Sequence, residues 1–374
     1  MFTTIILFVA ILSILVFVHE FGHFWTAKKL GVKAEEFGLG FPPRAWGIYK
    51  STNNKWKQVW GTKDVKDAED TIYSINFIPL GGFVKIKGEN GESLDTDSFA
   101  SKPIWCRFLI LSAGVTMNVL LTAFLLAVGF TIGLPQVIDN EVSKSATISD
   151  ERIQITQVLS DTPASKAGIK MGDIITNINS VEFSNIIDMQ DYVAENTGEA
   201  LSYSIKRGDE VLIYEITPEV LEETKIGGIG VAVAATGMVK FPWYIAIWKG
   251  LVSAILLVIA IIVAFYNLFK DIFTGVGVGG DIAGPVGIAS LTGDMAKLGF
   301  VYILQFTALL SANLAVVNFL PFPALDGGRV LFLIIEKFKG SPVKRDLEAT
   351  IHYIGFALLM VLVVFVTFKD IAKF

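Results

Sequence analysis

The sequence of 374 residues has little cysteine, little histidine and little charge. Its one cysteine, Cys106, excludes an intramolecular disulfide bond and any metal cluster built from cysteines. Charged residues make up 18% of the chain, the formal net charge is −5 and no long basic run exists, so nucleic acid is not an expected partner. Only 3 residues are histidines, and two of them stand four residues apart near the N-terminus.

Apolar residues are abundant: 52% of the chain is hydrophobic, with a mean hydropathy of +0.57. This composition indicates a polytopic membrane protein with room for one soluble domain. Five uncharged apolar stretches approach or exceed the ~20 residues that a helix needs to cross a bilayer. They are residues 2–18, 108–134, 251–269, 298–325 and 351–368.

The first apolar stretch leads into the pattern His19-Glu20-x-x-His23. On a helix this spacing puts both imidazoles on one face, where they can share a Zn²⁺, and Glu20 can take a proton from a metal-bound water. Ionisable residues within a membrane span are costly and are usually functional. The pattern therefore predicts hydrolysis of a peptide bond within the membrane.

The first stretch lacks a positive n-region and a small-residue cleavage site, so we expect a span and not a signal peptide. Its basic residues, Lys28, Lys29 and Lys33, all follow the apolar run. The positive-inside rule then places the N-terminus outside and the two motif histidines in the cytosolic half of the helix.

A basic loop at residues 337–345 should also be cytosolic. With the segment after the second span outside and this loop inside, a helix over residues 298–336 must run from outside to inside. That leaves no net crossing for residues 251–269. We therefore expect four spans, with 251–269 lying at the membrane interface. The alternative, that 251–269 crosses, stays open.

Residues 31–107 show strand and turn patterns, with β-formers alternating over 73–87 around a Pro-Leu-Gly-Gly turn. This segment is too apolar for a free cytosolic hairpin, so we expect a re-entrant β-loop beside the metal. A small cytosolic sheet is the alternative.

Residues 151–219 differ in composition and alternate short strands with two short helices, the second predicted over 186–195. The run PASKAGIKMGDIITNIN resembles a PDZ domain of the bacterial type. PDZ domains bind peptide C-termini by adding a strand to a sheet edge.

A catalytic zinc held by two histidines needs a third protein ligand and an open position. Asp326 is the candidate, because it follows an uncharged run and two prolines that interrupt the helix before it. In the four-span topology Asp326 lies level with His23. The alternative role for Asp326 is a helix cap at the membrane edge.

Together these motifs resemble the site-2 protease family, in particular its bacterial zinc metalloproteases with a PDZ domain. The resemblance runs nearly end to end and also includes Ile78–Lys85 (IPLGGFVK), Ala113-Gly114 with Asn118, Gly284–Ile288 (GPVGI) and Asn318–Gly327 (NFLPFPALDG). Val115 stands where the family usually has proline, and one PDZ domain stands where some members have two.

The resemblance implies one Zn²⁺ at His19, His23 and Asp326, with Glu20 as general base. It also implies that Asn313 and Asn318 hold an unwound substrate and that the β-loop, at Gly81, Gly82 and Phe83, pairs with it. The implied substrates are pre-trimmed single-span membrane proteins, such as anti-sigma factors or remnant signal peptides, in a bacterial inner membrane.

We therefore expect a polytopic α-helical membrane protein with four transmembrane helices, a membrane-associated β-loop and one inserted extracytoplasmic PDZ domain (α+β). The expected parts are residues 1–135, 151–219 and 240–374. One rival function is a membrane-anchored PDZ adaptor with a structural metal, although such a site normally has four protein ligands. A metal transporter is disfavoured because the other spans lack ligands along a path. His352 is expected to be an interfacial residue and not a ligand.

Overall fold

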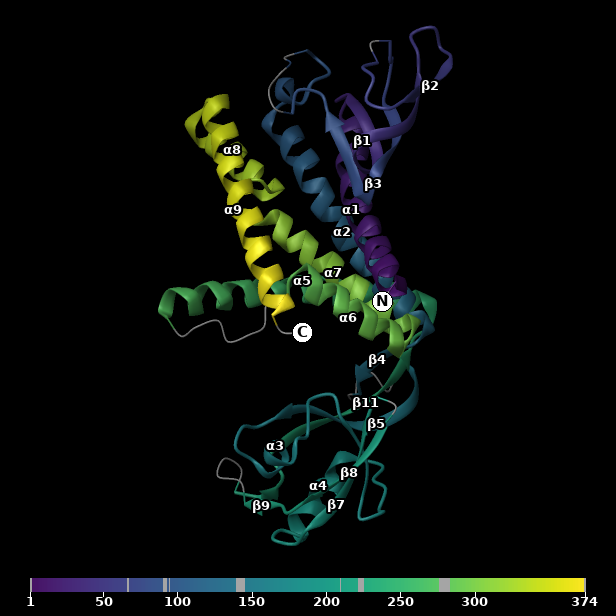
Figure 1. Cartoon of the computed structure of the whole chain (residues 1–374), viewed down its shortest axis with the longest axis vertical. Coiled ribbons are helices and arrows are strands. Elements are labelled where there is room, and N and C mark those ends of the chain that lie inside the picture. Colours follow the sequence, from purple (N-terminus) through teal and green to yellow (C-terminus); the bar gives the residue numbers. More distant parts are fainter. Residues whose placement is uncertain are drawn as a thin grey trace. The chain divides into compact units, whose positions relative to one another are not determined.

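The computed structural model describes residues 2–65, 67–89, 93, 95–138, 145–208, 210–220, 225–275 and 283–372. The chain folds as two compact units: one comprises the residues up to Ala127 and from Ile247 onward, and the other comprises Val128–Ala246. The first unit is mainly helical with a small sheet, and the second is built on a larger sheet (Figure 1). The three-part division expected from the sequence stays a prediction.

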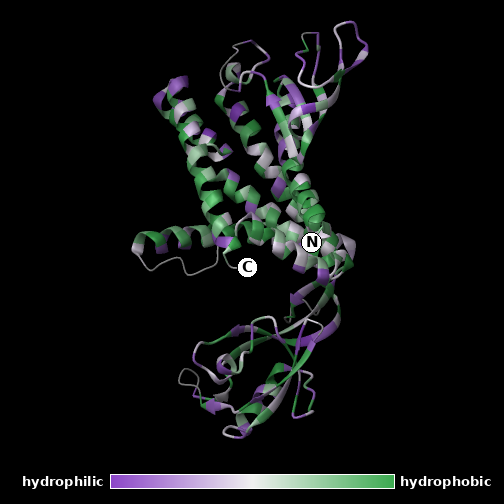
Figure 2. Ribbon diagram, in the orientation of Figure 1, coloured by the Kyte–Doolittle hydropathy of each residue, from purple (hydrophilic) through white to green (hydrophobic). Residues whose placement is uncertain are grey.

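Five helices are long and apolar enough to cross a membrane: α1 (Phe2–Lys29), α2 (Ile104–Ile132), α5 (Trp243–Thr274), α7 (Phe300–Phe319) and α9 (Arg345–Ile371). Hydrophobic residues predominate along these helices (Figure 2). These helices coincide with the five apolar stretches of the sequence.

Shorter helices complete the first unit: the 3₁₀ turn η1 (Phe99–Ser101), α6 (Pro285–Leu298) and α8 (Asp326–Lys339). The apolar run 298–325 does not form one continuous helix with the residues that follow it, because α7 ends at Phe319 and α8 begins at Asp326. Pro321 and Pro323 lie in this break, where proline removes a backbone donor and disfavours helix in the preceding residue. Asp326 thereby starts a new helix.

The small sheet has the order β2-β1-β3, from β1 (Ala34–Lys50), β2 (Trp56–Trp60) and β3 (Ile72–Ile86). The first half of β1 pairs with both ends of β3, since Phe37 lies opposite both Val84 and Tyr73. The second half of β1 pairs with β2 and with the beginning of β3. The last residues of β3, from Gly82 to Ile86, therefore form one edge of this sheet.

The turn of β3 that leads into this edge lies against α1. Ser13 Oγ in the middle of α1 donates to Pro79 O at 3.0 Å and accepts from Gly81 N–H at 3.2 Å. Gly81 has φ +68°, and an added Cβ there would lie 2.6 Å from Val16, so the approach requires glycine. Large apolar side chains around the turn are exposed: Leu39, Phe41, Ile75, Phe77, Ile78 and Leu80.

The second unit contains a six-stranded sheet of order β4-β11-β5-β6-β7-β8. Its strands are β4 (Leu134–Val137), β5 (Thr147–Val158), β6 (Ile174–Ile178), β7 (Leu201–Arg207), β8 (Glu210–Ile216) and β11 (Val231–Lys240). Helices α3 (Pro163–Ala167) and α4 (Ile186–Glu195) and the strand pair β9 (Glu219–Val220) with β10 (Gly227–Gly228) complete it. The bounds of α4 confirm the helix predicted over 186–195, whereas the sequence did not predict β4 and β11.

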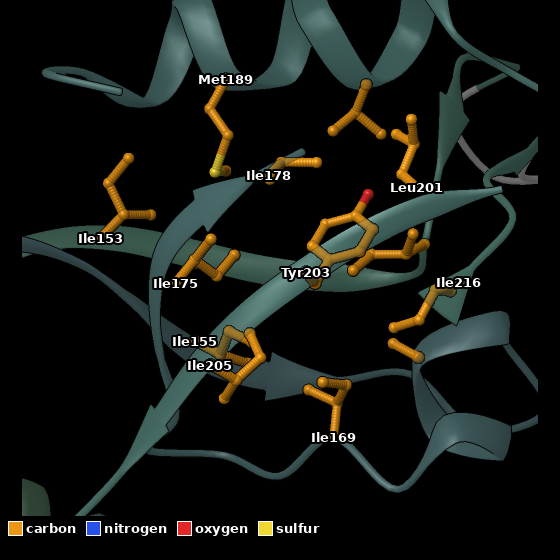
Figure 3. Packing of buried hydrophobic residues seen from close by; sticks show 13 residues of the cluster. Ile153, Ile155, Ile169, Ile175, Ile178, Met189, Leu201, Tyr203, Ile205 and Ile216 are labelled. Atoms are coloured by element: carbon orange, nitrogen blue, oxygen red, sulfur yellow. The ribbon is translucent and has the colours of Figure 1, made fainter. Parts of the chain in front are cut away.

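The core of the second unit lies between α4 and the sheet (Figure 3). Met189 reaches from α4 toward Ile178 and Tyr203, which are almost fully buried on β6 and β7. Apolar residues alternate along β7, with Leu201, Tyr203 and Ile205 all inward. The unit therefore has its own hydrophobic core.

Candidate metal centre

Two helices far apart in the sequence bring three donor atoms together. His19 and His23 lie one turn apart on α1 and are buried, with their Nε2 atoms 3.2 Å apart. Asp326 Oδ2, at the start of α8, lies 2.9 Å from His19 Nε2 and 3.2 Å from His23 Nε2. Tetrahedral zinc with bonds of 2.0–2.1 Å separates its donors by about 3.3 Å, so this set fits one zinc ion.

The break between α7 and α8 delivers Asp326 to this point. Gly327 and Gly328 pack directly against the carbonyl groups of the preceding turn, so that a Cβ on Gly327 would collide with Leu320 O and Phe319 O. The first turn of α8 can therefore fold back tightly under the end of α7. Ala324 adopts φ +77° in the same turn, a conformation that L-residues rarely adopt.

The other ring nitrogens fix the tautomer of each histidine. His23 Nδ1–H donates to Ile110 O at 2.8 Å, which leaves Nε2 with its lone pair toward the donor set. His19 Nδ1 lies 3.3 Å from the side-chain amide of Asn118, whose buried Oδ1 has no hydrogen-bond partner. Turning that amide by 180° lets Oδ1 accept from His19 Nδ1–H and satisfies the oxygen. Asn118 therefore orients His19.

Gly114 on α2 provides the space for the two imidazoles. A Cβ on Gly114 would lie 2.7 Å from His19 Cε1, 2.8 Å from His19 Nε2 and still closer to His23 Nε2. Any other residue would push into the donor set. The fit of zinc therefore rests on this glycine as well as on the three donors.

Glu20 lies next to His19 in the sequence but outside the group of three donors that the described residues form. Its Oε2 accepts a hydrogen bond from Val84 N–H of β3 at 3.2 Å. A carboxylate that is held beside a metal site without being a ligand can act as a general base.

The predicted substrate-binding residues lie at different distances from this centre. Asn318 Nδ2 is 3.3 Å from His19 Nε2, so Asn318 lies at the donor set. Asn313 is partly buried and donates to Leu309 O of its own helix at 2.9 Å, and its described hydrogen bond is not made to the donors. Gly81, Gly82 and Phe83 lie on β3 beside α1, and their contact with a substrate stays a prediction.

Sequence reasoning assigned Asn118 and Gly114 no role other than their match to the family motif. Their spacing could have indicated that both face the same neighbour, because residues i and i+4 share one helix face. His352 lies outside the donor group of the described residues, and it accepts a hydrogen bond from the turn before Asp326.

Apolar helices, an HExxH pair and a carboxylate from a second helix together define a membrane-embedded zinc metallopeptidase. The sequence profile described as peptidase family M50 matches residues 7–362. The chain belongs to this family, the site-2 proteases, and is a zinc metalloprotease of that family.

Relatives match over nearly the whole chain. The chain is 28% identical to the regulator of sigma-W protease RasP of Bacillus subtilis, over 99% of this chain and 98% of that protein. It is 32% identical to a putative zinc metalloprotease of Clostridium acetobutylicum, with the same coverage. Among solved structures, the PDZ domain of an SdrC-like protein from Listeria monocytogenes matches 23% of this chain and 92% of that chain, with 23% identity and a TM-score of 0.22.

Proposed function

We propose that this protein cleaves the transmembrane segment of pre-trimmed single-span membrane proteins, with His19, His23 and Asp326 as zinc ligands and Glu20 as general base. One observation carries the proposal: three donor atoms from two distant parts of the chain converge within 2.9–3.2 Å of one another, in helices apolar enough for a membrane. By analogy with the B. subtilis relative, whose name refers to sigma-W, an anti-sigma factor is one proposed substrate and a remnant signal peptide is another.

The residues around the centre divide the chemistry. A zinc ion bound there would supply Lewis acidity toward water and the scissile carbonyl. Glu20 accepts the proton of the attacking water and passes it to the leaving amine, while Val84 N–H holds its carboxylate in place. Ile110 O and Asn118 keep the imidazoles in the tautomer that leaves both Nε2 atoms available.

The edge of β3 is suited to bind an unwound substrate. A helical substrate hides its peptide bonds, and an added strand would replace the hydrogen bonds that are lost. Val84 N–H on this edge points to Glu20, so a strand that pairs with residues 82–86 would lie beside the general base. Asn318 lies close enough to His19 to bind the substrate backbone there, and Asn313 would bind it farther away.

Contacts of α6 support the four-span topology. Gly293 of α6 packs on Thr4 at the start of α1, and Gly287 N–H donates to Asp370 Oδ2 near the end of α9 at 2.8 Å. The start of α1 and the end of α9 therefore both contact α6, as expected if the number of crossings is even. In Figure 1, α5 runs nearly horizontally whereas α9 runs closer to the vertical. This difference in direction supports α5 as the interfacial helix.

The orientation follows from charge. Lys28, Lys29 and the basic loop at 337–345 are placed in the cytosol, which puts the centre in the cytosolic half of the bilayer and the PDZ-like unit outside a bacterial inner membrane. There the PDZ-like unit would act as a size filter that also binds newly exposed C-termini.

The test compares zinc content with cleavage of a single-span substrate, using purified protein in detergent. We expect Glu20→Gln to abolish cleavage and keep about one zinc per chain, whereas His23→Ala or Asp326→Ala loses both. Full zinc content and activity in Asp326→Ala would contradict the ligand assignment. A wild-type protein that binds zinc but cleaves no pre-trimmed substrate would support the PDZ adaptor instead.

A further inference from the structure

Helix α9 touches the turn that precedes Asp326. Gly355 and Asp370 are the buried residues of α9, and Asp370 lies near the C-terminal end of the helix. Gly355 packs against Pro323, so closely that an added Cβ would lie 2.6 Å from Pro323 O. His352 precedes Gly355 by three residues and shares its helix face. This face of α9 is therefore held against the 320–325 turn.

His352 makes one directed contact there. Ala324 N–H donates to His352 Nδ1 at 2.9 Å, and Phe332 of α8 packs on the imidazole with ring centroids 5.4 Å apart. Because Nδ1 accepts, the hydrogen of a neutral ring is on Nε2. The packing thus orients the imidazole, and Nδ1 is the atom that accepts the hydrogen bond.

The bond is made to a residue in an unfavourable conformation. Ala324 has φ +77°, which crowds the Cβ of an L-residue and persists only where the surroundings impose it. Leu325 follows as the N-cap of α8, and Asp326 is the first residue of that helix. The conformation of Ala324 therefore sets the direction in which the Asp326 carboxylate leaves the turn.

We infer that His352 is a positioning residue for the zinc ligand Asp326, acting through its hydrogen bond to Ala324 N–H. The inference rests on the proposed function, in which Asp326 binds zinc. His352 itself is not one of the three donor residues found among the described residues. The required feature is an acceptor at the Nδ1 position, and the ring serves only to hold that acceptor.

Three substitutions separate the acceptor from the ring. His352→Phe keeps the packing against Phe332 and removes the acceptor. In His352→Asn, the side-chain oxygen can occupy the place of Nδ1 and accept the same bond. Ala324→Gly removes the steric cost of the positive φ, so it should reduce the need for the acceptor. Tyr353→Phe, at the next and exposed position of α9, is the matched control.

The measurements are zinc affinity by competition with a chelator, and kcat and KM for a pre-trimmed substrate. We expect His352→Phe to lower zinc affinity by about 10- to 100-fold and to lower kcat with little change in KM, as loss of a group that orients a ligand does. His352→Asn should stay within about threefold of the wild type, and Ala324→Gly should recover most of the loss caused by His352→Phe. Tyr353→Phe should change neither quantity.

Wild-type zinc affinity in His352→Phe would overturn the inference, provided that Asp326→Ala loses zinc. If Asp326→Ala keeps its zinc, the ligand set itself is wrong, and the two failures are thus distinguished. If His352→Phe does not fold, His352→Asn and the double variant with Ala324→Gly decide. An asparagine variant as weak as the phenylalanine variant, or no recovery with glycine, would show that only ring packing matters and would refute the role of the bond.

Discussion

Gly114→Ala tests the zinc site by a single methyl group. The added Cβ would lie 2.8 Å from His19 Nε2 and closer still to His23 Nε2, whereas carbon contacts settle near about 3.5 Å. One or both imidazoles must then move by roughly 1 Å, which is about half the length of a zinc–nitrogen bond. The atoms in the way belong to histidine side chains and not to backbone, so the fold can tolerate the change while the donor set cannot.

The expected effects on the apo and zinc-bound proteins have opposite signs. Zinc affinity should fall at least about 100-fold, which removes about 2.7 kcal/mol of zinc-linked stability at saturating zinc. The zinc-free protein should be unchanged or more stable by up to about 1 kcal/mol, because alanine is favoured over glycine inside a helix. A variant that was simply misfolded would lose stability in both states.

The assay is thermal unfolding in detergent with and without zinc, together with chelator competition. Thr116→Ala, on the same helix but exposed, is the control and should keep wild-type affinity. Wild-type zinc affinity in Gly114→Ala would refute the reasoning, because zinc could not then be held between His19 and His23 in this arrangement.

Three further predictions concern topology, the PDZ-like unit and pH. A reporter that is active only outside the cytosol should work when fused after Phe374, which lies outside the described residues; activity only of a cytosolic reporter would mean that α5 crosses. Deleting residues 152–218 should spare hydrolysis of a pre-trimmed substrate and permit some cleavage of the full-length one, whereas equal loss of both would show that the unit is needed for catalysis. Burial alone would raise the pKa of Asp173, but hydrogen bonds from Arg207 and from Lys170 N–H outweigh it and hold that pKa below its ordinary value. A lowered native pKa stabilises above the unfolded value of about 4, so hydrogen-exchange protection of β6 and β7 should fall as the pH drops below about 4, and less steeply in Asp173→Asn.

Local periodicity carried the predictions that depend on neighbours in the sequence. The i, i+4 spacing of His19 and His23 needs only one helix to bring the imidazoles together, and the apolar pattern over 186–195 matches α4. The five apolar stretches became the five long helices for the same reason. These features are set within one element, so the sequence alone could predict them.

Contacts between elements could not be predicted in the same way. Gly114 reaches the histidines only because α2 packs closely against α1, and His352 reaches Ala324 across 28 residues of sequence. Neither Gly114 nor His352 lies in a periodic sequence pattern that would indicate which residue it contacts. The charge pattern predicted that Asp326 lies level with His23, and in the structure Asp326 Oδ2 and His23 Nε2 lie 3.2 Å apart.

The order of histidine and glutamate within the motif determines the side from which we expect the substrate to approach. On a helix, adjacent residues point about 100° apart, so His19 and Glu20 face different neighbours. The face with His19 and His23 meets α2 and α8, whereas Ser13 and Glu20, seven residues apart and on nearly one face, meet β3. We therefore expect a peptide that pairs with the β3 edge to approach from the Glu20 side of α1, beside Val84. In the proposed function, α1 would supply two zinc ligands and the base, and its contacts with β3 would support the substrate-binding strand.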